Sequence, residues 1–176
     1  MGTIRLQPGE CWFEIPVIDA APDTRGRGAN ERQYILAKVR HNRLIDMFVG
    51  AVARPLSGAP HVVLHDIGRI GTDEIYVALR NSGQRFVVAV LARGEADQIN
   101  TMQVEQNLEL CRAIFPTLSP RLVTIQFKTD VVGEVIVMFD LVVVGDEIKV
   151  LDEKHYRLVP ASEIDDEDRK AMANLK

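Results

Sequence analysis

Apolar residues in the first third of the chain recur at the spacing of one helix face. The pattern over residues 31–48 predicts a single helix that begins after Asn30, a preferred N-cap with Gln33 three positions further on. Gly50 and Pro55 end this helix, and a loop is expected over residues 55–60. The apolar stripe of the helix consists of Ile35, Leu36, Val39, Leu44, Ile45 and Phe48.

The middle of the chain changes to alternating and β-branched sequence. Residues 72–79 alternate weakly between polar and apolar positions, and residues 85–91 are strongly β-forming. The turn signal Asn81-Ser82-Gly83 lies between them, so the two segments predict a β-hairpin. A further short strand is expected over residues 61–66.

The second half of the chain begins with a helical pattern and continues with strands. The helix is predicted over residues 97–115 and ends at Pro116. Residues 134–144 form an almost continuous β-branched run, which is typical of a strand covered on both faces. Ser162 is expected to cap a short C-terminal helix. The other strands predicted in this half are 121–128, 147–151 and 154–159.

This order of elements predicts an α/β fold with a mixed central β-sheet flanked by α-helices. The sheet would have about five or six strands, with the two long helices packed against it. Residues 1–29 are rich in Pro and Gly and predict an irregular N-terminal arm with one short strand at 11–18. The α/β domain would span residues 30–160, and residues 161–176 would form an acidic C-terminal helix or tail.

Composition places the chain among soluble globular proteins of one domain. It has 176 residues, of which 47% are hydrophobic and 26% charged. The longest apolar run, over residues 135–144, is too short for a transmembrane helix, and the first residues lack the pattern of a secretory signal. The two cysteines lie far apart and exclude a disulfide framework, so we expect a reduced, cytoplasmic protein without a membrane partner.

The net charge of −4 means that any nucleic-acid binding requires a local basic patch. The first predicted helix offers one, made of Arg32, Lys38, Arg40 and Arg43. Such side chains contact backbone phosphates and make binding dependent on salt. The alternative is a solvated helix face on which Arg40 or Arg43 pairs with Asp46.

The hairpin turn decides which side chains lie opposite Asp73. A three-residue loop with Gly83 in the left-handed conformation pairs Arg80 with Gln84, and counting back sets Asp73 opposite Leu91. Arg93 lies two residues beyond Leu91 on the same face, so the three side chains would converge on one patch. A two-residue loop would instead set Ala92 opposite Asp73.

Several sequence runs carry a resemblance to a known family. The first hairpin strand begins Thr72-Asp73-Glu74-Ile75-Tyr76-Val77, and the second ends Leu91-Ala92-Arg93-Gly94. Residues 37–44 read Ala-Lys-Val-Arg-His-Asn-Arg-Leu, and residues 153–159 read Glu-Lys-His-Tyr-Arg-Leu-Val. Taken in order over residues 30–160, these runs resemble the PD-(D/E)xK nuclease superfamily, and within it bacterial restriction-endonuclease-like proteins.

The resemblance implies a Mg²⁺-dependent DNA endonuclease ancestry with an altered catalytic motif. In the family, an Asp on one hairpin strand and a Glu-x-Lys or Gln-x-Lys on the next bind Mg²⁺ and activate water. Here Leu91 stands in place of the Glu or Gln, and Arg93 in place of the Lys. Leu91 offers no oxygen ligand, and an arginine cannot be deprotonated to act as a base.

The site residues follow from this resemblance. Asp73 is expected to be the remaining metal ligand, with Glu74 as a second ligand; Glu31 or Asp66 are alternative sources of a carboxylate. Arg93 would contact phosphate, and Gln103, near the start of the second helix, would line the site.

We therefore expect a restriction-endonuclease-like protein that binds DNA and has a weak or lost Mg²⁺ phosphodiesterase site. A homodimer is expected by analogy with enzymes of this fold. The alternatives are a non-catalytic protein-interaction module and an active endonuclease with a relocated carboxylate.

Overall fold

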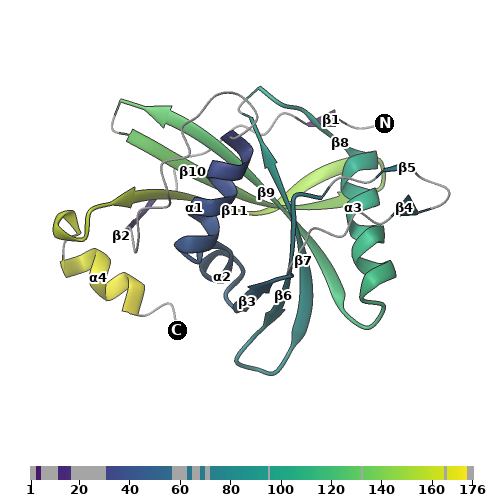
Figure 1. Cartoon of the computed structure of the whole chain (residues 1–176), viewed down its shortest axis with the longest axis horizontal. Helices are drawn as coiled ribbons and strands as arrows, with labels where there is room; N and C mark the ends of the chain where they lie inside the picture. The colour runs from purple at the N-terminus through teal and green to yellow at the C-terminus, as the bar shows by residue number, and fades with distance from the viewer. Residues whose placement is uncertain are drawn as a thin grey trace.

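A mixed, seven-stranded β-sheet forms the centre of the computed structural model (Figure 1). The structure describes residues 3–4, 12–16, 31–56, 63–64, 68–69, 72–94, 96–131, 133–164 and 166–173. Strands follow in the order β2-β11-β10-β9-β7-β6-β3 across the sheet. Their bounds are β2 Trp12–Pro16, β3 Val52–Pro55, β6 Glu74–Leu79, β7 Arg85–Arg93, β9 Ser119–Asp130, β10 Gly133–Val144 and β11 Glu147–Val159.

Helices cover both faces of this sheet. On one face, α1 (Glu31–His41) and α2 (Leu44–Val49) pack in a core cluster that includes Leu36, Phe48 and Val90. On the other face, α3 (Thr101–Ile114) packs in a second cluster with Ile75 and Leu91. Alternation along β7 explains why Val90 and Leu91 belong to different core clusters, because neighbouring strand residues face opposite sides of the sheet. The predicted α/β fold with a mixed central sheet flanked by helices is confirmed.

Three smaller features complete the described chain. Two-stranded pairs join β1 (Thr3–Ile4) to β8 (Ile99–Asn100) and β4 (Val63–Leu64) to β5 (Gly68–Arg69). A short 3₁₀ turn at Ala161–Glu163 precedes α4 (Asp166–Ala173), which agrees with the predicted short C-terminal helix. Ser162 lies inside the 3₁₀ turn, so its predicted capping position is wrong. Within the described residues, no helix has the length and apolar character needed to span a membrane.

The single helix predicted over residues 31–48 is wrong, because the chain forms two helices there. The Asn42 side-chain amide donates to the Lys38 carbonyl at 2.9 Å, and the Asn42 backbone N–H bonds to the same oxygen. Arg43 then adopts the left-handed conformation, with φ 53° and ψ 36°. Short polar side chains compete in this way for helical backbone groups. The predicted N-cap, Asn30, lies outside the described residues.

Several predicted strand boundaries also differ. The residues between the predicted first helix and the predicted loop over 55–60 form β3. This strand lies at the edge of the described sheet, where Pro55 is tolerated. The two strands predicted over 147–151 and 154–159 are one strand, β11, with a register shift opposite Asp140 and Leu141. The helix predicted from residue 97 begins at Thr101. Of the strand predicted over 61–66, Val63–Leu64 is found and the rest lies outside the described residues.

Candidate functional site

The β6–β7 hairpin has the predicted three-residue turn. The Arg80 backbone N–H donates to the Gln84 carbonyl at 2.9 Å, and Gly83 has a positive φ of 85°. The ladder continues to the pair Glu74 and Val90. Asp73 comes one residue before this pair, so the register built on the three-residue loop is confirmed and the two-residue alternative is wrong.

Asp73 and Arg93 meet at the open end of this hairpin, as predicted. Asp73 Oδ2 accepts a hydrogen bond from the Ala92 backbone N–H at 2.8 Å and lies 3.5 Å from Arg93 Nη1. Arg32 of α1 approaches from the other side, with Nη1 3.8 Å from Asp73 Oδ1. The side chains of Asp73 and Arg93 are 15% and 13% exposed, whereas that of Arg32 is 54% exposed. One largely buried carboxylate therefore lies between two guanidinium groups.

Burial and charge act in opposite directions on Arg93. Desolvation by burial lowers the pKa of its guanidinium, while the Asp73 carboxylate counteracts the shift. An arginine pKa starts so high that the group still keeps its charge at neutral pH. Arg93 is thus a fixed cation that neutralises Asp73.

Leu91 lies in the core instead of contributing to a polar site. Its exposed fraction is 0%, and it belongs to the same aliphatic cluster as Ile75, Ile99 and Val104. This position of the hairpin is therefore filled by hydrocarbon and offers no oxygen ligand. A Mg²⁺ ion takes oxygen ligands, and a single carboxylate paired with a guanidinium does not fit it.

Glu74, the second predicted metal ligand, is held by a different set of partners. Its Oε1 forms an ion pair with Arg40 of α1, and its Oε2 accepts the Tyr76 hydroxyl at 2.6 Å. Because neighbouring strand residues alternate in direction, Glu74 and Asp73 are held on different sides of the strand. Within the described ranges, no group of three or more His, Cys, Asp or Glu side chains lies close enough to hold a metal ion. The Glu31 side chain and Asp66 lie outside the described residues.

Gln103 takes part in the N-terminal cap of α3. Its side-chain Oε1 accepts the Asn100 backbone N–H at 3.1 Å, and the Asn100 side chain accepts the Gln103 backbone N–H at 2.9 Å. The spacing Asn-x-x-Gln is that of a capping box, so the sequence contained this signal. The predicted role of Gln103 in lining a catalytic site stays a prediction.

Each of the four cations predicted to bind nucleic acid faces a carboxylate of the protein itself. Arg32 approaches Asp73 and Arg40 pairs with Glu74, while Arg43 pairs with Asp46, as the solvated-face alternative proposed. Lys38 bonds to Glu134 of β10, and its ammonium lies 4.6 Å from the centre of the Tyr34 ring. Burial opposes the charge of Lys38, but the hydrogen bonds to Glu134 and Tyr34 outweigh it and raise the Lys38 pKa.

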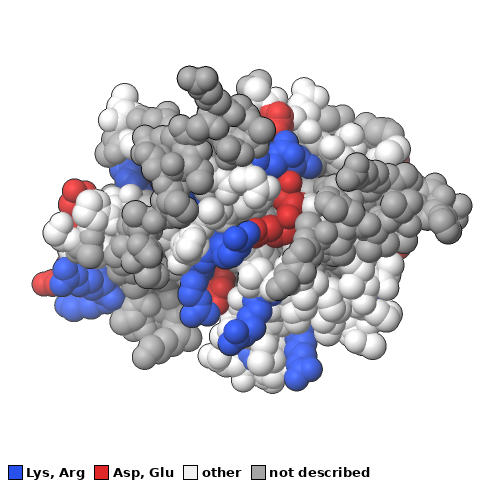
Figure 2. All heavy atoms as spheres, in the orientation of Figure 1, with Lys and Arg blue, Asp and Glu red and all other residues white. Residues whose placement is uncertain are grey.

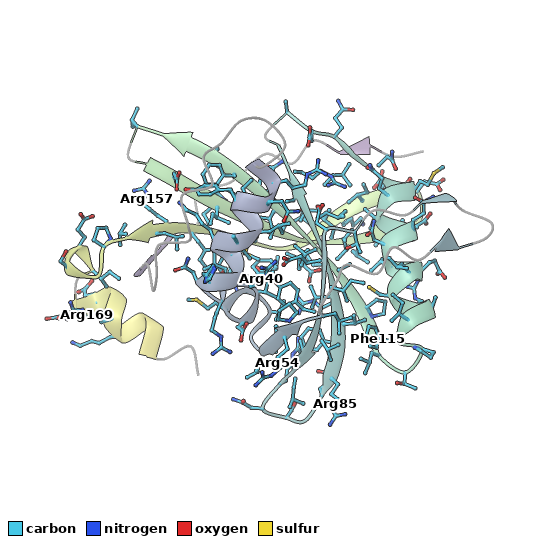
Figure 3. The ribbon with its side chains drawn as sticks, in the orientation of Figure 1. Arg40, Arg54, Arg85, Phe115, Arg157 and Arg169 are labelled. Carbon is cyan, nitrogen blue, oxygen red and sulfur yellow. The ribbon has the colours of Figure 1, made fainter. Side chains whose placement is uncertain are left out.

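Other exposed arginines have no carboxylate partner among the described residues. They are Arg54 of the edge strand, Arg80 at the hairpin turn and Arg85 at the start of β7. Arg80 instead lies 5.1 Å over the Phe86 ring. Figure 2 shows Lys and Arg side chains over the middle and lower part of the face in view. In Figure 3, drawn in the same orientation, Arg40, Arg54 and Arg85 lie successively lower. Sequence reasoning missed these three arginines, because they are scattered over two strands and a turn.

Comparison of the chain with protein-family models, with curated proteins and with solved structures gave no match.

Proposed function

We propose that the chain is a restriction-endonuclease-like protein that binds DNA and whose Mg²⁺ phosphodiesterase centre is lost. The observation that carries the proposal is the pairing of Asp73 with Arg93 at the end of the hairpin, while Leu91 between them in the motif is buried. This hairpin holds an acid and a cation at the register that the family resemblance predicts. It lacks the second oxygen ligand.

The arrangement of elements supports the fold part of the proposal. Helix α1 precedes the β6–β7 hairpin, helix α3 follows it, and the next strand, β9, pairs in parallel with β7. That order matches the layout on which the family resemblance rests. The parallel connection through α3 brings the end of β7, with Arg93, to the same end of the sheet as the N-terminus of α3.

The charges at the site favour phosphate binding over hydrolysis. Hydrolysis of a phosphodiester by this family's chemistry requires a metal ion that activates water. Here the Asp73 carboxylate, the only predicted metal ligand on the hairpin face of Arg93, accepts a backbone N–H and is neutralised by a guanidinium. Arg32, with half of its side chain exposed, and the exposed arginines Arg54, Arg80 and Arg85 remain able to contact backbone phosphates.

The decisive experiment measures binding and cleavage of the same duplex DNA. Fluorescence anisotropy with a labelled duplex should give binding that weakens steeply between about 50 and 200 mM salt, as expected for several phosphate contacts. Incubation with plasmid and Mg²⁺ or Mn²⁺ should give no cleavage. Absence of binding at low salt would refute the proposal. Metal-dependent cleavage that Asp73→Ala abolishes would instead support an active enzyme with a relocated carboxylate.

A second function, a non-catalytic protein-interaction module, is favoured by one feature of the sheet edge. Strand β3 is a terminal strand of the described sheet, and Val52 on it and Leu79 on its neighbour β6 are 48% and 43% exposed. Edge strands with exposed apolar side chains pair readily with other chains. Sedimentation of the purified protein as a dimer that Val52→Lys dissociates, together with no DNA binding, would favour this function.

A further inference from the structure

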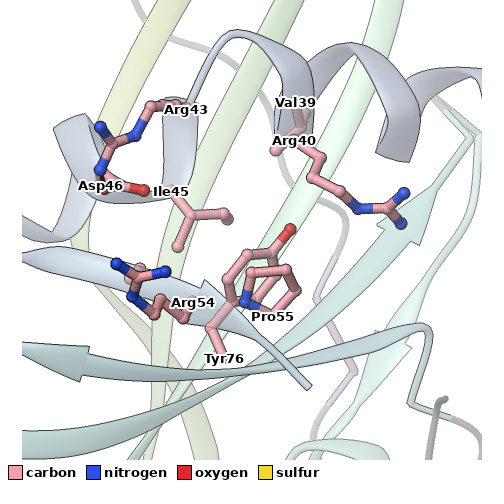
Figure 4. Close-up of a pocket in the computed structure, with 9 residues that line it drawn as sticks. Val39, Arg40, Arg43, Ile45, Asp46, Arg54, Pro55 and Tyr76 are labelled. Carbon is pink, nitrogen blue, oxygen red and sulfur yellow. Dashed lines mark hydrogen bonds and ion pairs between the residues drawn. The ribbon is translucent and has the colours of Figure 1, made fainter. Parts of the chain in front are cut away.

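A second group of arginines surrounds a surface hollow that does not include Asp73 or Arg93. The hollow has a volume of about 200 Å³ and lies between α1, α2 and the strands β3 and β6. Val39, Ile45 and Tyr76 are buried and form its floor. Figure 4 shows Arg43 and Arg54 on one side of the hollow and Arg40 on the other.

The charges around the hollow leave a net positive site. Arg40 and Arg43 each pair with one carboxylate, Glu74 and Asp46 respectively. Arg54 is exposed and has no carboxylate partner among the described residues. Three guanidinium groups therefore face two carboxylates, and the remaining charge fits a monoanion. Guanidinium groups bind phosphate oxygens in a bidentate manner, and they are common where phosphate is recognised.

The backbone at Arg43 fixes the position from which this side chain extends. Of the described residues, Arg43 is the only non-glycine with a positive φ. Residues in this conformation are usually Gly or Asn, because a Cβ atom clashes with the following carbonyl. An arginine held there, at the break between α1 and α2, directs a long cationic side chain to the rim of the hollow.

We propose that this hollow binds a phosphate group through Arg54 and Arg43, with the apolar floor beneath it. The phosphodiester of a nucleic-acid backbone is the source we favour. In that form the inference rests on the proposed DNA binding and assigns it a contact point. Tyr76 lies three residues after Asp73 in the chain, so the hollow and the hairpin site are roughly 10 Å apart along the chain and on opposite sides of the strand.

The test compares three variants in two binding assays. Arg54→Ala removes the exposed arginine without an internal partner, and Arg43→Gly removes the other guanidinium while leaving a residue that adopts the left-handed backbone freely. Arg112→Ala is the matched control, because Arg112 is an exposed arginine of α3 that pairs with Glu109. Thermal unfolding of each variant checks that it is folded.

In the first assay, anisotropy with labelled duplex DNA is measured over a range of salt concentrations. Arg54→Ala and Arg43→Gly should each weaken DNA binding about 3- to 10-fold and lower the salt slope by about one, as for the loss of one phosphate contact. Arg112→Ala should leave both quantities unchanged. If the wild type binds DNA and both hollow variants bind equally well, the inference is refuted while the proposed function stands.

In the second assay, calorimetric titration with inorganic phosphate and with a mononucleotide separates the two sources of phosphate. If the wild type fails to bind DNA but binds these small anions, and Arg54→Ala loses that binding, the phosphate site is supported and the proposed DNA function is refuted. If neither DNA nor the small anions bind to the wild type, both proposals fail.

Discussion

Replacement of Asp73 is expected to destabilise the fold, in addition to any effect on function. Its Oδ2 accepts the Ala92 backbone N–H at 2.8 Å, and Ala92 is fully buried. A hydrogen bond to a charged group contributes about 1.5–3 kcal/mol, and an unsatisfied buried N–H costs about 1–3 kcal/mol. Asp73→Ala also removes the main counter-charge of the Arg93 guanidinium, which is 13% exposed. We expect a loss of about 3 kcal/mol in the free energy of unfolding.

Asp73→Asn separates the hydrogen bond from the charge. The asparagine oxygen can still accept the Ala92 N–H, but it no longer neutralises Arg93. About half of the destabilisation of Asp73→Ala is therefore expected, roughly 1.5 kcal/mol. In urea, with a slope of about 2 kcal/mol/M, the alanine variant should unfold about 1.5 M earlier than the wild type and the asparagine variant about 0.75 M earlier.

A double-mutant cycle and a surface control complete this experiment. If Asp73 and Arg93 interact, the double alanine variant should lose less stability than the two single variants combined. Glu109→Gln, which alters an exposed ion pair with Arg112 on α3, should change stability by less than about 0.5 kcal/mol. The reasoning is refuted if Asp73→Ala costs less than about 1 kcal/mol, or if the asparagine and alanine variants are equally unstable.

Three further predictions follow from other buried groups. Leu91→Glu combined with Arg93→Lys should lower the stability of the metal-free protein by about 3–5 kcal/mol, because it buries a carboxylate. The same double variant should bind Mg²⁺ with heat that calorimetry detects. Absence of heat would mean that the site lies elsewhere. Burial raises the pKa of Asp140, so the folded state binds its proton more tightly than the unfolded chain. The stability of the wild type relative to Asp140→Asn should therefore fall as pH rises above about 4, and a flat difference in urea titrations would contradict this. Burial raises the pKa of the Cys111 thiol to about 11. In a Cys11→Ser background, the native protein should therefore resist a thiol reagent at pH 8 and react with it once unfolded. Rapid labelling of the native protein would contradict this prediction.

Short-range sequence signals were enough to predict the hairpin and the meeting of Asp73 with Arg93. A turn with Gly83 in the left-handed conformation determines which residues pair, and strand alternation then determines which side chains share a face. Because both rules act within about 20 residues, no knowledge of the rest of the fold was needed. The apolar helix positions that pack against the sheet could be predicted for a similar reason, because helical spacing is also a local property of the chain.

The ion-pair partners of the cations on the first helix could not be predicted in this way. Lys38 is paired with a carboxylate 96 residues away and Arg40 with one 34 residues away, and neither partner is indicated by local sequence. The end of the first helix at His41 was also missed, although four consecutive positions without an apolar residue, between Val39 and Leu44, were a weak sign of it.

The sequence by itself therefore determined the α/β class, the hairpin register and the presence of an aliphatic residue, Leu91, two positions before Arg93. Only the tertiary structure decided which cations remain available, where the edge strand β3 lies and that Arg43 and Arg54 face one hollow. The physical reason is the range of the interactions: backbone conformation and strand alternation are local properties of the chain. Ion pairs and surface hollows arise only when packing of the helices on the sheet brings distant segments together.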